Sequence, residues 1–301
     1  MRKQKKIKVQ TTHQRACRVA LIYTLLRSTL TWITDRVWLD MHPYMRVILC
    51  SLLPLAVVLF LYDRMRNVDR NEFYRLRPIT PDGVAVWILF GIGANSFATM
   101  LNLPVQRFLS GFEAFEVAAT HLPATAAEYI IGIFVFCLLP AVLEELFCRG
   151  IILREYERYG TFFAVVAAAS MFAVLHMTVA SFVFTWVLGI VLAVVVLKTN
   201  SVYPAIIMHF SVNLFSLTRN YLTYLMPPIM QELWMAVQIF VLGLCAFGFV
   251  FAMAMLVKLN GKAHIIQRDY SQRFGISISF ILLISIYILH HIRLLTEMIF
   301  V

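Results

Sequence analysis

Six polar residues within long apolar stretches of this sequence have the types that hydrolysis of a carbonyl compound needs. A carboxylate can take a proton from water, a neutral imidazole can orient that water or bind a divalent metal ion, and a carboxamide can donate a hydrogen bond to an oxyanion. The six residues are Glu144, Glu145, Arg149, His176, His209 and Asn213. Their spacing decides whether they can act together.

The two adjacent glutamates are expected to have different neighbours. Consecutive residues of an α-helix point about 100° apart, whereas residues four apart share a face. Glu145 is therefore expected to pair with Arg149, which leaves Glu144 free to point into the bundle. The alternative for this pair alone is a helix that simply ends at the water interface.

The two histidines also have structural interpretations when each is taken alone. A single histidine such as His176 often serves as a hydrogen bonder between membrane helices, and His209 with Asn213, four residues apart on one face, could do the same. The expected depths of these residues in the membrane favour a joint role in one site. Glu144 lies 16 residues before Gly160, the expected turn, and His176 lies 16 residues after it.

His209 fits the same depth. It follows Lys198, the expected end of another helix pair, by 11 residues. At about 1.5 Å per residue, all three side chains lie roughly 15 Å inside one membrane boundary. Ionisable groups at such a depth favour a functional cavity, although equal depth does not show which helices are neighbours.

The composition predicts that lipid surrounds these elements. Hydrophobic residues make up 61% of the 301 residues and charged residues only 14%, against about 45–50% and 25% in soluble domains. The sequence therefore predicts an all-α, polytopic transmembrane bundle of about eight or nine helices. The expected spans lie near 18–35, 45–62, 84–101, 127–147, 161–178, 180–197, 203–218, 233–257 and 277–297.

Charge placement predicts a multi-pass orientation with a cytoplasmic N-terminus. The basic residues cluster in short segments between apolar runs, a pattern typical of cytoplasmic loops near anionic lipid and not of a nucleic-acid-binding surface. With nine spans, the inside segments hold 19 of the 26 Lys and Arg residues. Those segments are 1–16, 63–83, 148–160, 198–202 and 258–276. The first span is the weakest, because Arg18 and Arg27 are costly in a bilayer, and the segment 102–125 is the longest expected outer loop.

Three motifs in order resemble a known family. They are Glu144-Glu145-x-x-x-Arg149, Phe172-x-x-x-His176 and His209-x-x-x-Asn213. Over roughly residues 125–220 the sequence resembles the CPBP intramembrane protease family, also called the type II CAAX prenyl endopeptidase or Abi family. The resemblance implies glutamate-dependent proteolysis, with catalytic roles for Glu144, His176, His209 and Asn213. It implies supporting roles for Glu145, Arg149 and Phe172.

The metal remains open at this point. Two histidines and a glutamate match a zinc site with one open position, in which His176 and His209 are the candidate ligands. That arrangement would use Glu144 as a ligand and leave no separate base. We favour Glu144 as the base of a water-activating site, with a divalent ion such as zinc as an open possibility.

The expected partners are the lipid bilayer and a membrane-associated peptide or protein tail near the cytoplasmic leaflet. One alternative is a non-catalytic peptide-binding or bacteriocin-immunity membrane protein with the same fold. Another is a transporter or proton relay, which would favour matching halves with broken helices, and none is evident. The sequence suggests three parts: an N-terminal basic segment with the first helices (1–124), a catalytic core (125–220) and C-terminal helices (221–301).

Overall fold

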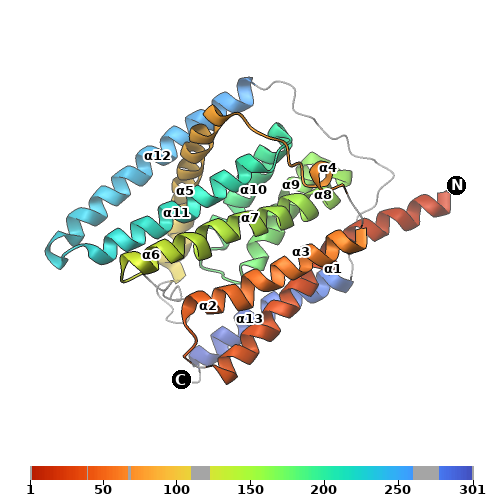
Figure 1. The fold of residues 1–301 in the computed structure, drawn as a ribbon, viewed down its shortest axis with the longest axis horizontal. Coiled ribbons are helices and arrows are strands. Elements are labelled where there is room, and N and C mark those ends of the chain that lie inside the picture. The colour runs from red at the N-terminus through yellow and green to blue at the C-terminus, as the bar shows by residue number, and fades with distance from the viewer. Residues whose placement is uncertain (1, 39, 67–68, 110–122, 260–277, 300–301) are drawn as a thin grey trace.

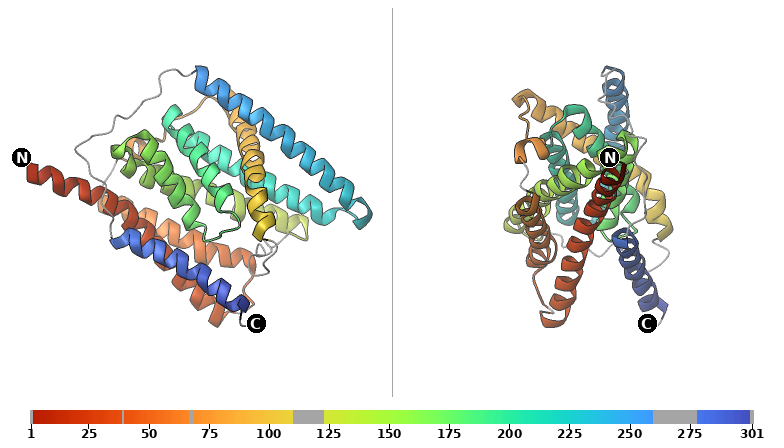
Figure 2. Two further views of the ribbon diagram at one scale, coloured as in Figure 1. Left: turned by 180° about the vertical axis from the view of Figure 1, so that it is seen from behind. Right: turned by 90° about the vertical axis from the view of Figure 1, so that its right-hand side faces the viewer.

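The protein is a bundle of helices in a computed structural model that describes residues 2–38, 40–66, 69–109, 123–259 and 278–299. Figures 1 and 2 show long helices that lie side by side and cross one another at varied angles. No strand occurs within the described ranges. The main helices are α1 (Arg2–Val37), α2 (Pro43–Val47), α3 (Leu53–Arg66), α4 (Arg70–Phe73), α5 (Pro81–Leu109), α9 (Thr161–Leu175), α10 (Phe182–Thr199), α11 (Tyr203–Leu225), α12 (Gln231–Leu259) and α13 (Ile278–Ile299).

The remaining helix is the longest candidate span and carries the two glutamates. It runs without a break over Ala126–Tyr159 and contains α6 (Ala126–Gly132), α7 (Leu139–Glu145) and α8 (Leu153–Tyr156). Two π-helical turns, η3 (Ile133–Leu138) and η4 (Leu146–Ile152), separate these parts. In the same way α2, the π-helical turn η1 (Ile48–Leu52) and α3 form one helix over Pro43–Arg66.

The nine expected spans correspond to nine helical segments, but several boundaries were wrong. The glutamate helix continues past residue 147 to Tyr159, and α11 continues past 218 to Leu225. The expected outer loop at 102–125 begins only after Leu109, because Pro104 lies inside α5 without ending it. Residues 110–122 of that loop and 260–276 of the last inside segment lie outside the described residues.

Five of the described helices are long and apolar enough to cross a membrane. They are Pro43–Arg66, Pro81–Leu109, Ala126–Tyr159, Phe182–Thr199 and Pro228–Ala254. Thr161–Leu175 and Ile278–Ile292 are apolar but shorter. Exposed leucine, isoleucine and phenylalanine side chains on the outer helices, such as Phe240 and Phe247 on α12, fit a surface that faces lipid.

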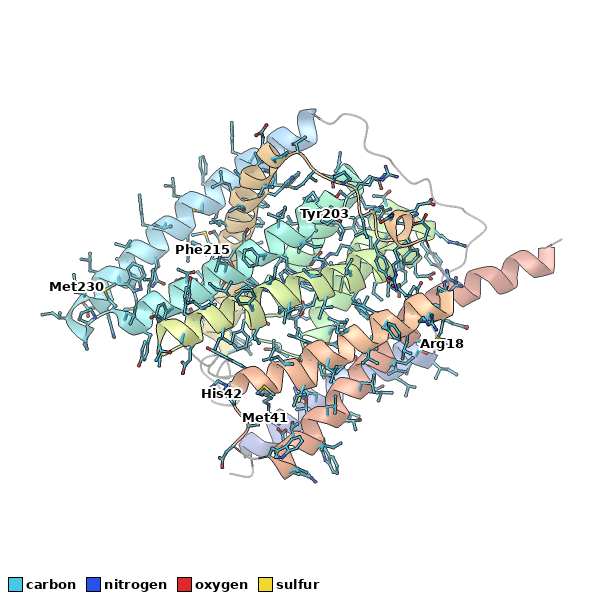
Figure 3. The ribbon with its side chains drawn as sticks, viewed as in Figure 1. Arg18, Met41, His42, Tyr203, Phe215 and Met230 are labelled. Carbon is cyan, nitrogen blue, oxygen red and sulfur yellow. The ribbon has the colours of Figure 1, made fainter. Side chains whose placement is uncertain are left out.

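The core lies where α5, α9, α10, α11 and the glutamate helix meet. α10 packs on α9 and α5, and α5 packs also on α11 and α12. Figure 3 shows that the bundle has two ends: Met41 and His42 lie near one, in the turn that joins α1 to α2, and Arg18 lies near the other. α1 and α13 lie side by side along one flank.

Small residues allow α9 and α10 to approach closely. A Cβ atom added at Gly189 on α10 would lie 2.9 Å from the Cα of Ala169 on α9. That distance is shorter than real contacts allow, so a larger residue must push the two backbones apart. The close approach of α9 and α10 therefore depends on this glycine.

We expect Gly189→Ala to lower the free energy of unfolding by about 1–3 kcal/mol, because overpacking a tight helix contact forces backbone shifts. Unfolding in mixed micelles of neutral detergent and dodecyl sulfate measures this change. Gly248→Ala on α12 is the matched control, since a Cβ there meets nothing within 4 Å and alanine is the better helix former. Equal stabilities of the two variants would contradict the close contact at Gly189.

Candidate active site

Three helices bring Glu144, His176 and His209 to one place. Glu144 lies on α7, His176 follows the last residue of α9, and His209 lies in the second turn of α11. The Oε2 atom of Glu144 is 3.8 Å from Nε2 of His176 and 4.0 Å from Nε2 of His209. That Oε2 is buried and has no hydrogen-bond partner among the described residues. At these two separations the carboxylate lies beside both imidazoles without a direct hydrogen bond to either.

A buried ion pair holds His209. Glu145 and Arg149 pair one helical turn apart, with 2.7 Å between Oε1 and NH1, as the spacing predicted. The same Oε1 accepts a hydrogen bond from Nδ1 of His209 at 2.8 Å, a contact that the sequence did not reveal. NH2 of Arg149 also donates to the carbonyl of Gly189 on α10. The pair thus joins three helices as well as stabilising one.

Phe172 positions the second histidine. Its carbonyl oxygen lies 2.7 Å from Nδ1 of His176, and its ring packs edge-on against that imidazole with 4.5 Å between centroids. The guanidinium of Arg149 lies 4.6 Å from the centre of the same ring, and His209 meets it edge-on. Phe172 is thus in contact with both histidines and with the arginine, which explains how it can support the site.

These hydrogen bonds set the tautomers of the two histidines. A carbonyl oxygen only accepts, and so does an ionised carboxylate, so Nδ1 of His176 and Nδ1 of His209 both carry a proton. In the neutral rings Nε2 is then a lone-pair acceptor. Both Nε2 atoms face the free oxygen of Glu144. Three acceptor atoms around one point suit a donor such as water, or a cation.

Glu144, His176 and His209 are residue types that bind zinc, but their atoms lie farther apart than the ligands of a bound zinc ion. Ligands about 2.0–2.2 Å from a tetrahedral zinc lie about 3.3–3.5 Å from one another. The separations here are 3.8 and 4.0 Å. Within the described ranges, no group of three His, Cys, Asp or Glu side chains has the spacing of a metal site. The separations are thus wider than a bound zinc would set, and zinc binding by His176 and His209 stays a prediction.

A small cavity opens on one side of the carboxylate. It has a volume of about 140 Å³ and lies between α1, the α2–α3 helix, α7 and α9. Glu144 and His176 are on its wall, together with Tyr23, Arg27 and Ser51. This volume holds several water molecules, since each needs only about 30 Å³ of liquid volume.

Arg27 is the site residue that sequence reasoning treated as a difficulty. NH1 of Arg27 on α1 donates to the carbonyl of Leu175, the residue before His176, at 2.5 Å. Its side chain also interacts with Tyr23, whose neighbours include Glu144. The signal was available, because a charged residue inside a span indicates a functional or interior position. Arg18, in contrast, is exposed.

Asn213 lies one turn after His209 on α11 and is half-buried. Neither it nor His209 is on the wall of the cavity, which includes Cys148 among its apolar part. The catalytic and supporting roles assigned to these residues stay predictions. What the geometry gives is a carboxylate and two imidazoles that meet, with Glu145, Arg149 and Phe172 around them.

Comparison with known proteins adds the family. Residues 126–215 match the family described as type II CAAX prenyl endopeptidase Rce1-like. A comparison with curated proteins and one with solved structures gave no significant match. The matched segment contains Glu144, Phe172, His176, His209 and Asn213, and it lies within the expected core 125–220. The chain is thus a multi-pass integral membrane protein whose segment 126–215 matches the Rce1-like type II CAAX prenyl endopeptidases, a match that supports the resemblance to the CPBP intramembrane protease family.

Proposed function

We propose that this protein is an intramembrane endopeptidase in which Glu144 activates the attacking water. The observation that carries this proposal is the buried Oε2 of Glu144, which lacks a hydrogen-bond partner among the described residues and faces Nε2 of two histidines at 3.8 and 4.0 Å. A water molecule there can donate to the carboxylate and to an imidazole at once. The membership of residues 126–215 in a protease family supports the same chemistry.

The proposed reaction begins when Glu144 takes a proton from the water. As that O–H bond breaks, the oxygen bonds to the scissile carbonyl carbon and an oxyanion forms. The C–N bond then breaks, and Glu144 returns the proton to the leaving amine. A positioned carboxylate used in this way contributes about 10²–10⁴-fold to a rate.

The histidines are proposed to hold the water and to respond to the developing charge. His209 can take positive charge because its Nδ1–H points at Glu145, and a carboxylate stabilises an imidazolium. His176 is fixed by the Phe172 carbonyl and orients the water from the other side. Asn213 is the proposed donor to the oxyanion.

The substrate is proposed to be a membrane-associated peptide or protein tail. With the N-terminus in the cytoplasm, the site lies nearer to the cytoplasmic leaflet, from which the tail would enter. The cavity beside Glu144 lies partly against α1 and α3, outside the segment that matches the family. Residues outside the matched segment therefore help to shape the space that the substrate would meet.

The test is to incubate the protein, purified in neutral detergent, with a library of membrane-tethered peptides and to identify new termini by mass spectrometry. A preparation carrying Glu144→Ala sets the background. We expect cleavage that the variant lacks and that persists after treatment with 1,10-phenanthroline. Loss of activity on chelation, restored by stoichiometric zinc, would refute the metal-free step. A folded protein that binds the peptides without cleaving them would instead indicate a peptide-binding protein.

We expect Arg27→Met to lower the cleavage rate about tenfold or more, because the end of α9 that carries His176 loses its hydrogen bond to NH1. Misplacement of a catalytic group by about 1 Å can cost up to 10²-fold. Arg18→Met is the matched control, since it removes the same charge from an exposed position of α1. Equal rates for both variants would show that Arg27 does not position the site.

A further inference from the structure

A second polar cavity lies apart from the site, at the end of the bundle where α3 and α8 finish. It has a volume of about 430 Å³, and its wall is formed by Arg66, Phe73, Arg154, Glu155, Glu157 and Arg158. α4, which carries Phe73, and α8 lie next to each other at this end (Figure 1). No residue of the catalytic proposal lines this cavity.

The two glutamates of this cavity are strongly bound by groups other than the wall arginines. Oε1 of Glu155 accepts from the hydroxyl of Tyr62 at 2.9 Å, and Oε1 of Glu157 lies 2.6 Å from NH2 of Arg75. Both glutamates are almost fully buried. Their carboxylates are therefore already engaged before the wall arginines are considered.

The wall arginines are held only loosely. Arg66 lies 3.7 Å from Glu155, and Arg154 lies 3.4 Å from Glu157. Arg158 is exposed and forms no ion pair with any described residue. Arg15 also lies 3.4 Å from Glu155, so four arginines share two glutamates, and Arg158 adds a fifth positive charge that is not part of these pairs. Three positive charges remain in excess around the hollow.

The neighbouring carboxylate of Asp63 does not cancel this excess. Asp63 on α3 pairs with Arg70 at 2.8 Å and accepts from the hydroxyl of Tyr74, so that pair is neutral. The helix dipole favours cations at the C-terminal ends of helices, and Arg66, Arg154 and Arg158 all lie in last turns. The dipole does not account for a cavity that these three side chains surround.

We propose that this cavity binds the phosphate group of an anionic phospholipid. Guanidinium groups match phosphate oxygens in two-point contacts, and basic pockets between membrane helices at the headgroup level bind lipid phosphates. The cavity lies where two candidate spans, Pro43–Arg66 and Ala126–Tyr159, both end, which is the depth of the headgroups. Phe73 supplies an apolar wall on which the glycerol end of a lipid can pack.

Lipid bound in this cavity would stabilise the helical hairpin that carries Glu144. Arg154 and Arg158 lie near the end of the helix that holds Glu144, and Gly160, with φ of 96°, turns the chain into α9. A lipid bound to these arginines and to Arg66 would therefore connect α3 to the base of this hairpin. The inference rests on the cavity alone and does not need the catalytic proposal.

The test is native mass spectrometry of the full chain, delipidated in neutral detergent and then given phosphatidylglycerol or phosphatidylcholine with the same acyl chains. We expect phosphatidylglycerol to be retained at least about fivefold more strongly. Arg154→Gln and Arg158→Gln should each weaken that retention about fivefold, which is the usual contribution of one basic residue at an anionic membrane surface. Each variant must keep the melting temperature of the wild type. Arg158→Gln is the less disruptive substitution, because Arg158 is exposed.

Arg64→Gln is the matched control, because Arg64 is exposed on α3, two residues from Arg66, and is not on the cavity wall. It should leave retention within about twofold of the wild type. Equal retention of both lipids, or a loss in the Arg64 variant as large as in the Arg158 variant, would overturn the proposal. Displacement of phosphatidylglycerol by millimolar inorganic phosphate, lost in Arg158→Gln, would assign the cavity to a soluble anion and refute the lipid.

Discussion

Replacing Glu144 with glutamine is expected to lower the rate constant of peptide cleavage by about 10³-fold, within the range known for general bases. Glutamine keeps the shape of the side chain but cannot take a proton from water. The free oxygen beside His176 and His209 would remain as an amide oxygen or be replaced by a nitrogen. Single-turnover cleavage of a peptide found in the library assay measures the effect.

Glu232→Gln is the control for this experiment, because it makes the same chemical change at an exposed position in the first turn of α12. It should cleave like the wild type. The Glu144 variant should keep the melting temperature and the peptide affinity of the wild type, since the mutation leaves the cavity shape unchanged. A Glu144 variant that retains more than about a tenth of the rate would exclude this residue as the base.

Replacing Arg149 with methionine is expected to lower the free energy of unfolding by about 3–5 kcal/mol, the usual cost of leaving one charge of a buried pair without its partner. Glu145 is fully buried, with 0% exposure, and Arg149 is 2% exposed. The methionine would leave the carboxylate with only His209 as a described partner. Reversible unfolding in mixed micelles measures the loss.

The double variant Glu145→Gln with Arg149→Met separates stability from catalysis. It removes both charges, so we expect most of the lost stability to return, because a neutral buried pair carries little desolvation penalty. Cleavage should stay low, since an amide stabilises a charged His209 less than a carboxylate does. A double variant that is stable and fully active would show that Glu145 only supports the fold.

The depth of the site could be predicted from the sequence because helices have a fixed rise. Equal residue counts on either side of Gly160 placed Glu144 and His176 at one height, and the two side chains do meet. The pairing of Glu145 with Arg149 followed from their spacing in the same way. Both predictions depend only on local helix geometry.

The contacts between helices could not be predicted, because they depend on how the helices pack. Arg27 was counted against the first span, yet it holds the end of α9. The hydrogen bond from His209 to Glu145 joins residues 64 positions apart. The end of the span expected near 84–101 was also wrong, since α5 continues through Pro104 to Leu109. A proline ends a helix only if no neighbouring element compensates for the lost hydrogen bond.

The shortness of α9 has a consequence for the supply of the second reactant, water. Its 15 residues span only about 22 Å, less than the roughly 30 Å of hydrocarbon in a bilayer. After His176 the chain is not helical again until Phe182, and Met177 has a left-handed backbone with φ of 56°. Open backbone at such a depth must be covered by protein or meet water. Asn102 covers part of it, by donating to the carbonyl of Ala180 and accepting from the amide of Phe184.

A helix shorter than the hydrocarbon thickness causes the bilayer to thin locally, and a thinner bilayer brings water closer to His176 and Glu144. Hydrolysis by this protein should therefore be sensitive to the lipid that surrounds it. In vesicles of defined acyl length, we expect the cleavage rate to fall as the acyl chains of the lipid lengthen. The rate of the same preparation in detergent serves as the reference. The thickness of the bilayer would then control the reaction rate by limiting how much water reaches the carboxylate of Glu144.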